Sequence, residues 1–253
     1  MHGKIILATS DIVMTLPQKI TPCPIIEAVV EIRFSSSIPP DAIFGLVYES
    51  FKDIFPSKPI DLPILQLPAQ IRNADPNLIY QAHYRFSHNG FLLQIGPKTI
   101  SVINKDEYVG WAAFSLKIKE CFNKMKSINV IEKTKRFGLR YINFFEGQNI
   151  FDKLNLEISI DGKTIIGDET YLSSIKKTED FVSNLKLSNS SKMERKGKET
   201  QGSLIDIDIF CEENGNTIYD NLDDILEKAH DAEKVIFFGL LKEAFLKELN
   251  PEY

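Results

Sequence analysis

Apolar and polar side chains alternate along residues 24–34, and this pattern predicts a β-strand. The even-numbered residues 28–34 are all apolar and would share one face of the strand. The opposite face would carry Glu27, Glu31 and Arg33. We therefore expect a strand with one core face and one charged face, around which the rest of the fold is organised.

The pattern that follows predicts a first half built from strands and helices. Apolar residues recur at helical spacing over 41–54 and again over 112–125. Between these two helices, strands are expected at 64–67, 78–86, 91–95 and 99–104. Asn89-Gly90 is a hairpin turn signal, so the strands should run antiparallel. The expected order of elements is β-α-β-β-β-β-α.

The remaining sequence predicts a second half with a similar plan. Strands are expected at 130–145, 156–160, 181–187 and 203–210, with helices at 149–154 and 221–241 and a last short turn at 243–249. The basic segment 188–201 should form a long hairpin loop. We therefore predict an α+β fold of two similar halves, 23–127 and 128–253, after an N-terminal arm at 1–22. Each half would be a mainly antiparallel sheet with helices packed on one face, and the predicted internal duplication depends on element order alone.

Charge and cysteine content narrow the class of protein. The net charge is -5, which argues against a dedicated nucleic-acid binder, although the basic segment 188–201 keeps that alternative open. Cys23, Cys121 and Cys211 are odd in number and far apart, which favours a reducing cytoplasm over a disulfide framework or a zinc pair. No run approaches the ~18 apolar residues of a membrane helix. We expect a cytoplasmic protein with no membrane segment.

A second charged strand face carries Arg136 and Arg140. If the two halves are related by a pseudo-dyad, their first strands would pair, and Glu27, Glu31 and Arg33 would face these two arginines. The five residues would then form a central charge cluster. They are the candidate ligand-binding residues of the chain.

Two hypotheses remain open for this cluster. It could be a cross-strand salt network, whose members each contribute up to about 1 kcal/mol. It could instead be a site, because paired arginines bind phosphate or carboxylate, and two carboxylates transfer protons or hold a divalent ion. The histidines have no metal-ligand spacing, and no glycine-rich phosphate loop, zinc-protease motif or nucleophile elbow occurs. We therefore predict no metal or cofactor, and the catalytic residues and enzyme status stay open.

Four motifs in this order carry a resemblance to a known family. They are Pro24-Ile25-Ile26-Glu27-Ala28 with Glu31 and Phe34; Leu93-Gln94-Ile95-Gly96 through Tyr108-Val109-Gly110-Trp111 and Phe114; Arg136-Phe137-Gly138-Leu139-Arg140-Tyr141-Ile142-Asn143; and Ala229-His230 with Phe237-Phe238-Gly239-Leu240-Leu241. Their combination resembles a sporadically distributed family of uncharacterised bacterial and archaeal proteins, over about residues 22–250. The resemblance implies a cytoplasmic protein of about this length, without an established activity, and provides no catalytic residue.

Two functions are therefore expected from the sequence. The first is a non-catalytic binding or interaction module that recognises a protein partner or a small anionic ligand. Apolar residues at 237–241 favour a homodimer, because one helix cannot bury both phenylalanines on the same face. The alternative is an enzyme or sensor that binds a phosphate-bearing small molecule or nucleotide in a central Glu/Arg cleft.

Overall fold

The computed structural model describes residues 16–195, 197–215 and 217–253 of the chain. Residues 1–15 of the predicted N-terminal arm lie outside this part. The contacts between residues divide the chain into two compact units. The larger unit contains residues 27–140 and 210–229, and the smaller unit contains residues 16–26, 141–209 and 230–253. These units do not coincide with the predicted halves, whose duplication stays a prediction.

The larger unit is built on an antiparallel sheet. Its strands follow the order β2-β3-β4-β5-β1-β6-β11, with residues 133–140 of β6 and 210–215 of β11 in this unit. The strand bounds are β1 Ile25–Ser35, β2 Ile60–Asp61, β3 Tyr84–His88, β4 Phe91–Gly96, β5 Thr99–Lys105, β6 Lys133–Glu146 and β11 Lys198–Gly215. Asn89 and Gly90 both have positive φ, as the predicted β3–β4 hairpin turn requires.

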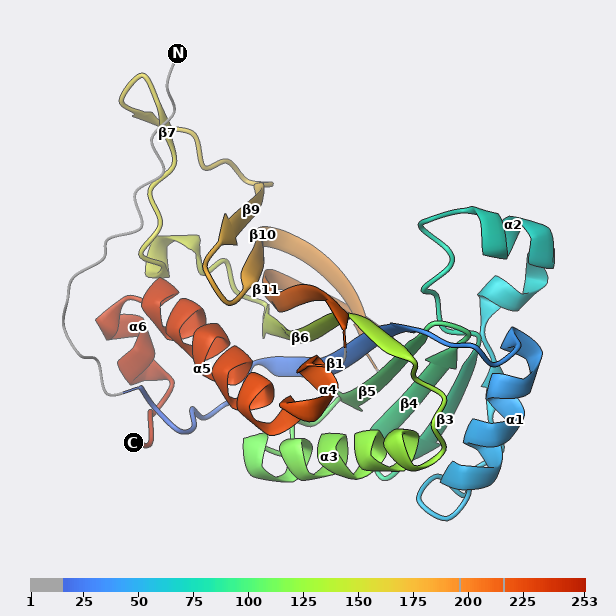
Figure 1. Cartoon of the computed structure of the whole chain (residues 1–253). Helices are drawn as coiled ribbons and strands as arrows, with labels where there is room; N and C mark the ends of the chain where they lie inside the picture. Colours follow the sequence, from blue (N-terminus) through green and yellow to red (C-terminus); the bar gives the residue numbers. More distant parts are fainter. Residues whose placement is uncertain (1–15, 196, 216) are drawn as a thin grey trace. The chain divides into compact units, whose positions relative to one another are not determined.

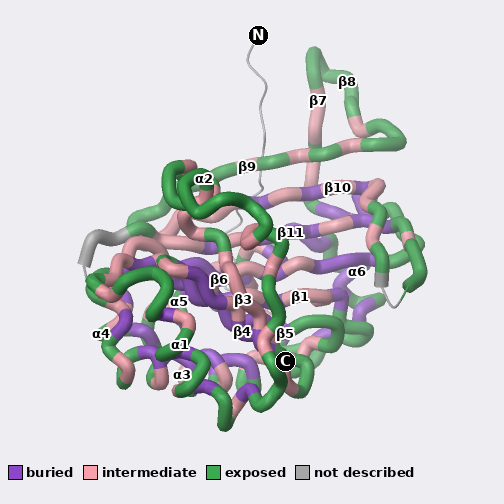
Figure 2. The backbone as a smooth tube through the Cα atoms, turned by 90° about the vertical axis from the view of Figure 1, so that its right-hand side faces the viewer, coloured by how far each residue is buried: buried purple, intermediate pink, exposed green. Residues whose placement is uncertain are grey.

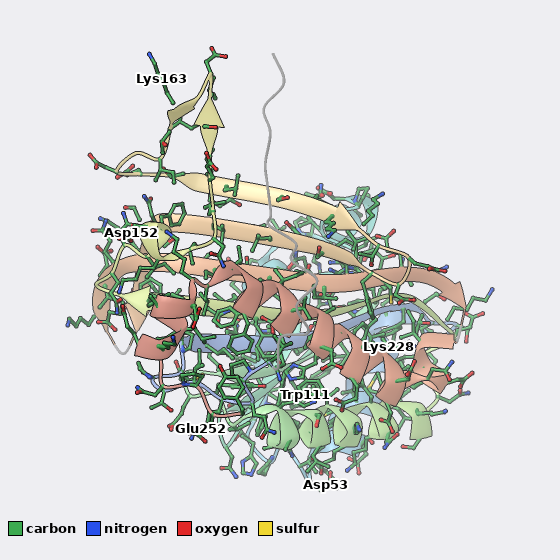
Figure 3. All side chains as sticks on the ribbon, turned by 90° about the vertical axis from the view of Figure 1, so that its left-hand side faces the viewer. Asp53, Trp111, Asp152, Lys163, Lys228 and Glu252 are labelled. Carbon is green, nitrogen blue, oxygen red and sulfur yellow. The ribbon has the colours of Figure 1, made fainter. Side chains whose placement is uncertain are left out.

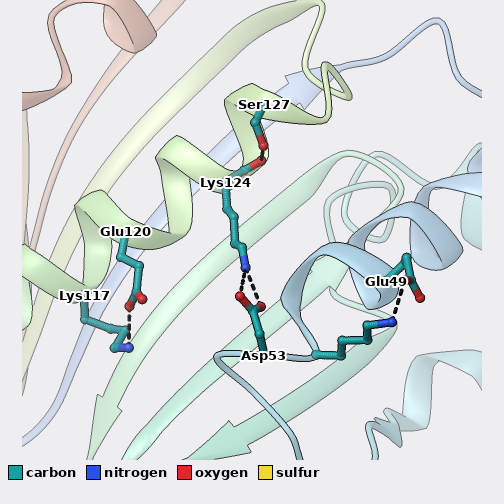
Figure 4. Close-up of polar contacts among 7 residues, drawn as sticks. Glu49, Asp53, Lys117, Glu120, Lys124 and Ser127 are labelled. Atoms are coloured by element: carbon teal, nitrogen blue, oxygen red, sulfur yellow. Dashed lines mark hydrogen bonds and ion pairs between the residues drawn. The ribbon is translucent and has the colours of Figure 1, made fainter.

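The apolar face of this sheet forms the core of the larger unit. Residues 28, 30, 32 and 34 of β1 are all buried, as their alternation predicts. Helices α1 (Pro40–Phe51) and α3 (Trp111–Ser127) pack on this face through their apolar stripes. Figure 1 shows both helices on the same side of β3, β4 and β5. The Asp53 carboxylate, just beyond α1, pairs with the Lys124 ammonium of α3 (Figure 4).

A different segment lies toward the other face of the same sheet (Figure 1). It contains the 3₁₀ helix η1 (Pro63–Gln66), helix α2 (Ala69–Ala74) and a turn over residues 75–81. Two predictions for this segment are wrong. The edge strand expected at 64–67 is absent, because residues 64–66 belong to η1, and the strand expected at 78–86 begins only at Tyr84.

Helix α3 has a second set of neighbours in the larger unit. They belong to α4 (Thr217–Asp220) and to the first residues of α5 (Leu222–Leu240). The Tyr219 hydroxyl donates to the Phe122 carbonyl at 2.8 Å, and Trp111 Nε1 donates to Glu227 Oε2 at 2.9 Å. The larger unit therefore contains most of the predicted first half together with residues 217–229 from near the end of the chain.

The smaller unit is also antiparallel. Residues 141–146 of β6 lie beside β11, which is followed by β10 (Val182–Arg195) and β9 (Tyr171–Lys177). The remaining elements are η2 (Phe151–Lys153), β7 (Ser159–Ile160), β8 (Lys163–Thr164) and α6 (Glu243–Glu248). Lys163 stands on the exposed β7–β8 hairpin (Figures 2 and 3). The loop predicted at 188–201 is wrong, because β10 and β11 continue through most of it; Lys196 lies outside the described residues.

Apolar burial in the smaller unit bears on the expected homodimer. The apolar residues 205, 207 and 209 of β11 are buried, as predicted. Phe237 and Phe238 on α5 are 5% and 6% exposed, and their rings meet edge to face at 5.2 Å between centroids. This one chain therefore buries both rings on which the homodimer prediction depends. The predicted α+β class with a large antiparallel sheet is confirmed.

Candidate functional site

Three of the five predicted charged residues meet in the larger unit. The Arg33 Nε donates to Glu31 Oε1 at 2.7 Å, and Arg136 Nη1 donates to the same oxygen at 3.1 Å. One carboxylate oxygen therefore holds two guanidinium groups. The pairing of β1 with β6 brings Arg136 to this position, as the sequence predicts.

Arg136 is held as a structural partner of Glu31. Its side chain is only 12% exposed, and its guanidinium carbon lies 4.4 Å from the centroid of the Phe210 ring. Gly138, two residues further along β6, leaves room for it, because a Cβ there would lie 2.4 Å from Arg136 Nη1. A side chain at position 138 would therefore displace the Arg136 guanidinium from where it lies along its own strand.

Glu27 and Arg140 lie outside this charge cluster. Glu27 is four residues before Glu31 on β1, so their Cα atoms are about 13 Å apart at ~3.3 Å per residue. Its cross-strand neighbour on β5 is Lys105. Arg140 is four residues beyond Arg136 on β6, so the Cα atoms of the two arginines are also about 13 Å apart. The structure therefore does not bring the two predicted carboxylates together.

A cavity of about 270 Å³ opens beside the charge cluster, on the polar face of the sheet. We call it the polar cavity. Its lining includes one carboxylate, one guanidinium, a phenol, a carboxamide and two hydroxyl groups, from Glu31, Arg33, Tyr80, Gln94, Thr99 and Ser101. All of these residues belong to the larger unit.

Strand register explains why the cavity floor is polar. Glu31 lies directly across from Ser101 on β5, and Arg33 lies across from Thr99. Gln94 on β4 lies on the other side of Ser101. Cross-strand neighbours share a face, so these polar side chains lie together opposite the apolar core.

The cover of the polar cavity is the turn at residues 75–81. The Asp75 Oδ1 accepts a hydrogen bond from the Asn77 backbone at 2.8 Å, and Gln81 donates to the Leu78 carbonyl at 2.9 Å. The Gln81 backbone then passes close over Gly96, where an added Cβ would lie 2.4 Å from the Gln81 oxygen. This close approach fixes the height of the cover above the sheet.

Helix α2 contacts His83, the residue just before β3. The Arg72 Nη1 lies 3.5 Å from His83 Nδ1. Burial, followed by the positive charge of Arg72, lowers the pKa of His83. The neutral imidazole can accept a hydrogen bond from the arginine, which is the protonation state that this contact needs.

The Thr99 hydroxyl is the most informative group in the polar cavity. Its Oγ1 is buried and has no hydrogen-bond partner among the described residues. Ser101, which is 6% exposed, also makes no side-chain hydrogen bond within the described part of the chain. Buried hydroxyl groups normally have partners, so the Thr99 Oγ1 marks a place where a ligand could complete the bonding.

Arg33 has unused hydrogen-bonding capacity. Its Nε is bonded to Glu31, and its guanidinium carbon lies 5.1 Å from the centroid of the Tyr80 ring. No other described residue bonds to its Nη atoms. Its side chain is 36% exposed and lines the polar cavity. These two nitrogens can therefore meet an anion in bidentate fashion.

A larger cavity of about 380 Å³, between α3 and residues 219–224, is chemically different. Its lysines are already paired, Lys119 with Asp223 at 3.2 Å and Lys126 with Asp220 at 3.6 Å. Within the described ranges, no group of three or more histidine, cysteine, aspartate or glutamate side chains is placed to hold a metal ion. Every helix in those ranges is too short or too polar for a membrane span. The polar cavity is therefore the candidate site.

Glu31, Arg33 and Arg136 of the predicted candidates lie at or beside the polar cavity. Tyr80, Thr99 and Ser101 also line the cavity and were not among the predicted candidates. The signal for the two hydroxyl groups was present, because Thr99 and Ser101 alternate with apolar residues along β5. Pairing that alternation with the charged face of β1 would have located the cavity floor. Tyr80 was missed because its segment was predicted as a strand.

No protein-family model matches the chain, and no curated protein matches it significantly. The family resemblance of the four motifs therefore stays a prediction.

Proposed function

We propose that this protein is a non-catalytic binding module that holds a small anionic molecule in the polar cavity. The observation that carries this proposal is the buried Thr99 hydroxyl without a partner, directly across from Arg33. A hydroxyl donor and a two-nitrogen guanidinium edge on one surface are the groups that recognise a carboxylate or phosphate.

The arrangement of carboxylates favours binding over catalysis. The acid–base pair or divalent-ion site considered from the sequence would use Glu27 together with Glu31. Glu27 is about 13 Å away along β1. Glu31 itself is engaged with two arginines through Oε1. The proposed role is therefore recognition, with Glu31 and Arg136 holding Arg33 in place.

The size of the cavity favours a small ligand. Pockets for drug-sized molecules have volumes of about 300–1,000 Å³, and the polar cavity has about 270 Å³. A dinucleotide or a peptide would exceed this volume. A phosphate-bearing molecule of a few heavy atoms remains an alternative ligand, and it would use the same Arg33.

Isothermal titration calorimetry tests the proposal. The panel contains acetate, glycolate, glycine, inorganic phosphate and adenosine monophosphate. At least one small anion should bind, and Arg33→Ala should weaken it about tenfold or more, because a charge-assisted bidentate contact is lost. Thr99→Val, which keeps the side-chain shape, should also weaken binding while the protein stays folded.

The matched control is Lys98→Ala. It removes the same charge from the turn before β5, and Lys98 does not line the polar cavity. Its affinity should equal that of the wild type. Failure of the whole panel to bind, or an equal loss in Lys98→Ala and Arg33→Ala, would overturn the proposal.

A further inference from the structure

Glu31 presents an unused oxygen to the polar cavity. Its Oε1 accepts from Arg33 and Arg136, whereas Oε2 accepts no hydrogen bond from any described residue. The side chain is 23% exposed, and it lines the polar cavity. A purely anionic ligand would meet this carboxylate with like-charge repulsion. A ligand that also carries a cation would meet it favourably.

The floor of the polar cavity therefore has two parts of opposite preference. Arg33 and Thr99, paired across β1 and β5, offer a guanidinium and a hydroxyl to an anion. Glu31 and Ser101, the next pair on the same face, offer a carboxylate and a hydroxyl to a cation. The Arg33 Nε lies 2.7 Å from Glu31 Oε1, so the two charged groups adjoin each other. A ligand that meets both of them must therefore carry its two charges only a few bonds apart.

Resting on the anion-binding function proposed above, we infer that the ligand is a small zwitterion, a free amino acid or a molecule of the same chemistry. Its carboxylate lies against Arg33 and the Thr99 hydroxyl. Its ammonium group lies against Glu31 Oε2 and the Ser101 hydroxyl. A free amino acid combines both charges within the volume of the cavity, whereas a peptide segment separates its terminal charges.

Both charges are needed to complete the bonding of the site. A carboxylate alone would satisfy Thr99 and Arg33 but leave Glu31 Oε2 to water, without the stronger bond that a charged donor makes. An amine alone would leave the buried Thr99 hydroxyl as it is. The zwitterion provides a partner for each of these groups. This is the physical reason for preferring it to a simple anion.

Matched ligand pairs test the inference by isothermal titration calorimetry. The pairs are glycine with glycolate, alanine with lactate, serine with glycerate, and aspartate with malate, in which a hydroxyl replaces the ammonium. In at least one pair the amino acid should bind about tenfold or more tightly, because the charge-assisted bond to Glu31 is made only by the ammonium. In Glu31→Gln this preference should fall below about threefold.

The glutamine variant removes the charge that the ammonium would meet and also changes how Arg33 is held. The test is therefore the ratio of the amino-acid affinity to the hydroxy-acid affinity within each variant, and not either affinity alone. The matched control is Glu27→Gln, which makes the same change on the same face of β1, about 13 Å away. It should keep the full preference for the amino acid. Circular dichroism and the thermal midpoint establish that both variants are folded.

The outcomes separate the two proposals. If the hydroxy acids bind wild type as tightly as the amino acids, the zwitterion is ruled out and anion binding stands. If the preference survives in Glu31→Gln, or disappears equally in Glu27→Gln, the role of Glu31 is wrong. If no member of any pair binds, and no member of the anion panel binds either, the proposed binding function is wrong.

Discussion

Under the proposed function, Glu31 would serve both structure and binding. Its Oε1 holds Arg33 and Arg136, so both guanidinium groups are fixed before any ligand arrives. Fixing a side chain in advance lowers the entropy lost on binding. The other oxygen remains available to the polar cavity. The two hypotheses of a salt network and a site are therefore compatible at this residue.

Another buried residue, Glu233 on α5, concerns stability. It belongs to the smaller unit and is 6% exposed. Burial raises the pKa of Glu233 to about 8, while the nearby Lys234 acts in the opposite direction. One turn earlier, burial and then Lys234 lower the pKa of His230 to about 3, and the Tyr141 hydroxyl lies 3.4 Å from His230 Nδ1. Both side chains are therefore neutral in the folded protein at intermediate pH.

The two groups predict opposite pH effects on the free energy of unfolding. For Glu233 the folded pKa of about 8 is above the unfolded value of 4.5. The contribution of Glu233 to the free energy of unfolding therefore decreases as the pH rises from 4.5 to 8. For His230 the folded pKa of about 3 is below the unfolded value of 6.5, so stability falls as pH falls through that interval. The two terms offset each other from pH 4.5 to 6.5. We expect stability to decline from pH 6.5 to 8.

Glu233→Gln tests this expectation. The substitution keeps the shape and removes the ionisation, so the variant should be more stable than wild type at about pH 8 and nearly equal at about pH 4.5, by urea unfolding. The control is Asp231→Asn, an exposed acid on the same helix, whose stability difference should not change with pH. A pH-independent difference between Glu233→Gln and wild type would contradict the prediction.

At the residue scale, the alternation of polar and apolar residues allowed the sequence to predict which side chains share a strand face. It placed Glu31, Arg33 and Arg136 on the correct strand faces, because side-chain direction in a strand depends only on local backbone geometry. This alternation could not predict that the Thr99 hydroxyl has no hydrogen-bond partner among the described residues. Whether a buried hydroxyl has a partner depends on what packs over it, and that packing comes from residues 75–81.

Among the elements, the segment that covers the polar cavity is held by backbone contacts more than by apolar burial. Most of its residues are exposed or half-buried. The His83 backbone donates to the Ile95 carbonyl at 2.8 Å, where the segment joins β3. Segments with few buried apolar contacts open at low free-energy cost. The cover is therefore the part of the site most sensitive to backbone changes.

Gly96→Ala should displace this cover. The added Cβ would lie 2.4 Å from the Gln81 carbonyl oxygen, so the backbone must shift. We expect a loss of about 1–3 kcal/mol in unfolding free energy and faster amide exchange over residues 76–83, measured by mass spectrometry. Any ligand of the polar cavity should also bind more weakly.

The control for this prediction is Gly45→Ala on α1. Gly45 is exposed, and nothing lies within 4 Å of an added Cβ. Alanine in a helix interior should stabilise the protein by about 0.5–1 kcal/mol without changing exchange over residues 76–83. If Gly96→Ala were as stable as wild type, with unchanged exchange, the described role of Gly96 would be wrong.

Element type was predictable where the periodic pattern was long. The helices α1, α3 and α5 and the strands β1 and β4–β6 lie close to their expected positions. Short apolar runs were ambiguous, because Leu78-Ile79-Tyr80 reads as a strand by composition. The Asp75 side chain instead bonds the Asn77 backbone and begins a turn. A local hydrogen bond therefore outweighed β propensity.

At the scale of the whole molecule, the predicted halves and the observed units differ in their boundaries. The strands β1, β6 and β11 and helix α5 each contribute residues to both units. Element order predicted the α+β class, since order depends on local pattern. It could not predict which distant residues complete each unit, because that depends on pairing between strands far apart in sequence.

The fragment 23–127 decides whether the predicted first half can fold alone. In the larger unit, β1 has β6 as a neighbour, and α3 is contacted by residues 217–229. The fragment lacks both, so β1 would become an unpaired edge and Phe122 would lose part of its cover. We expect no cooperative thermal transition by circular dichroism, whereas the full chain should show one.

A longer fragment, 23–146, provides a graded control. It restores β6 beside β1 but still lacks residues 217–229, so its stability should lie between those of the shorter fragment and the full chain. This order follows from the contacts, because each addition restores buried surface. A cooperative transition in fragment 23–127, at the midpoint of the full chain, would contradict the expectation. It would support two autonomous halves, because only a unit with its own complete core unfolds in that way.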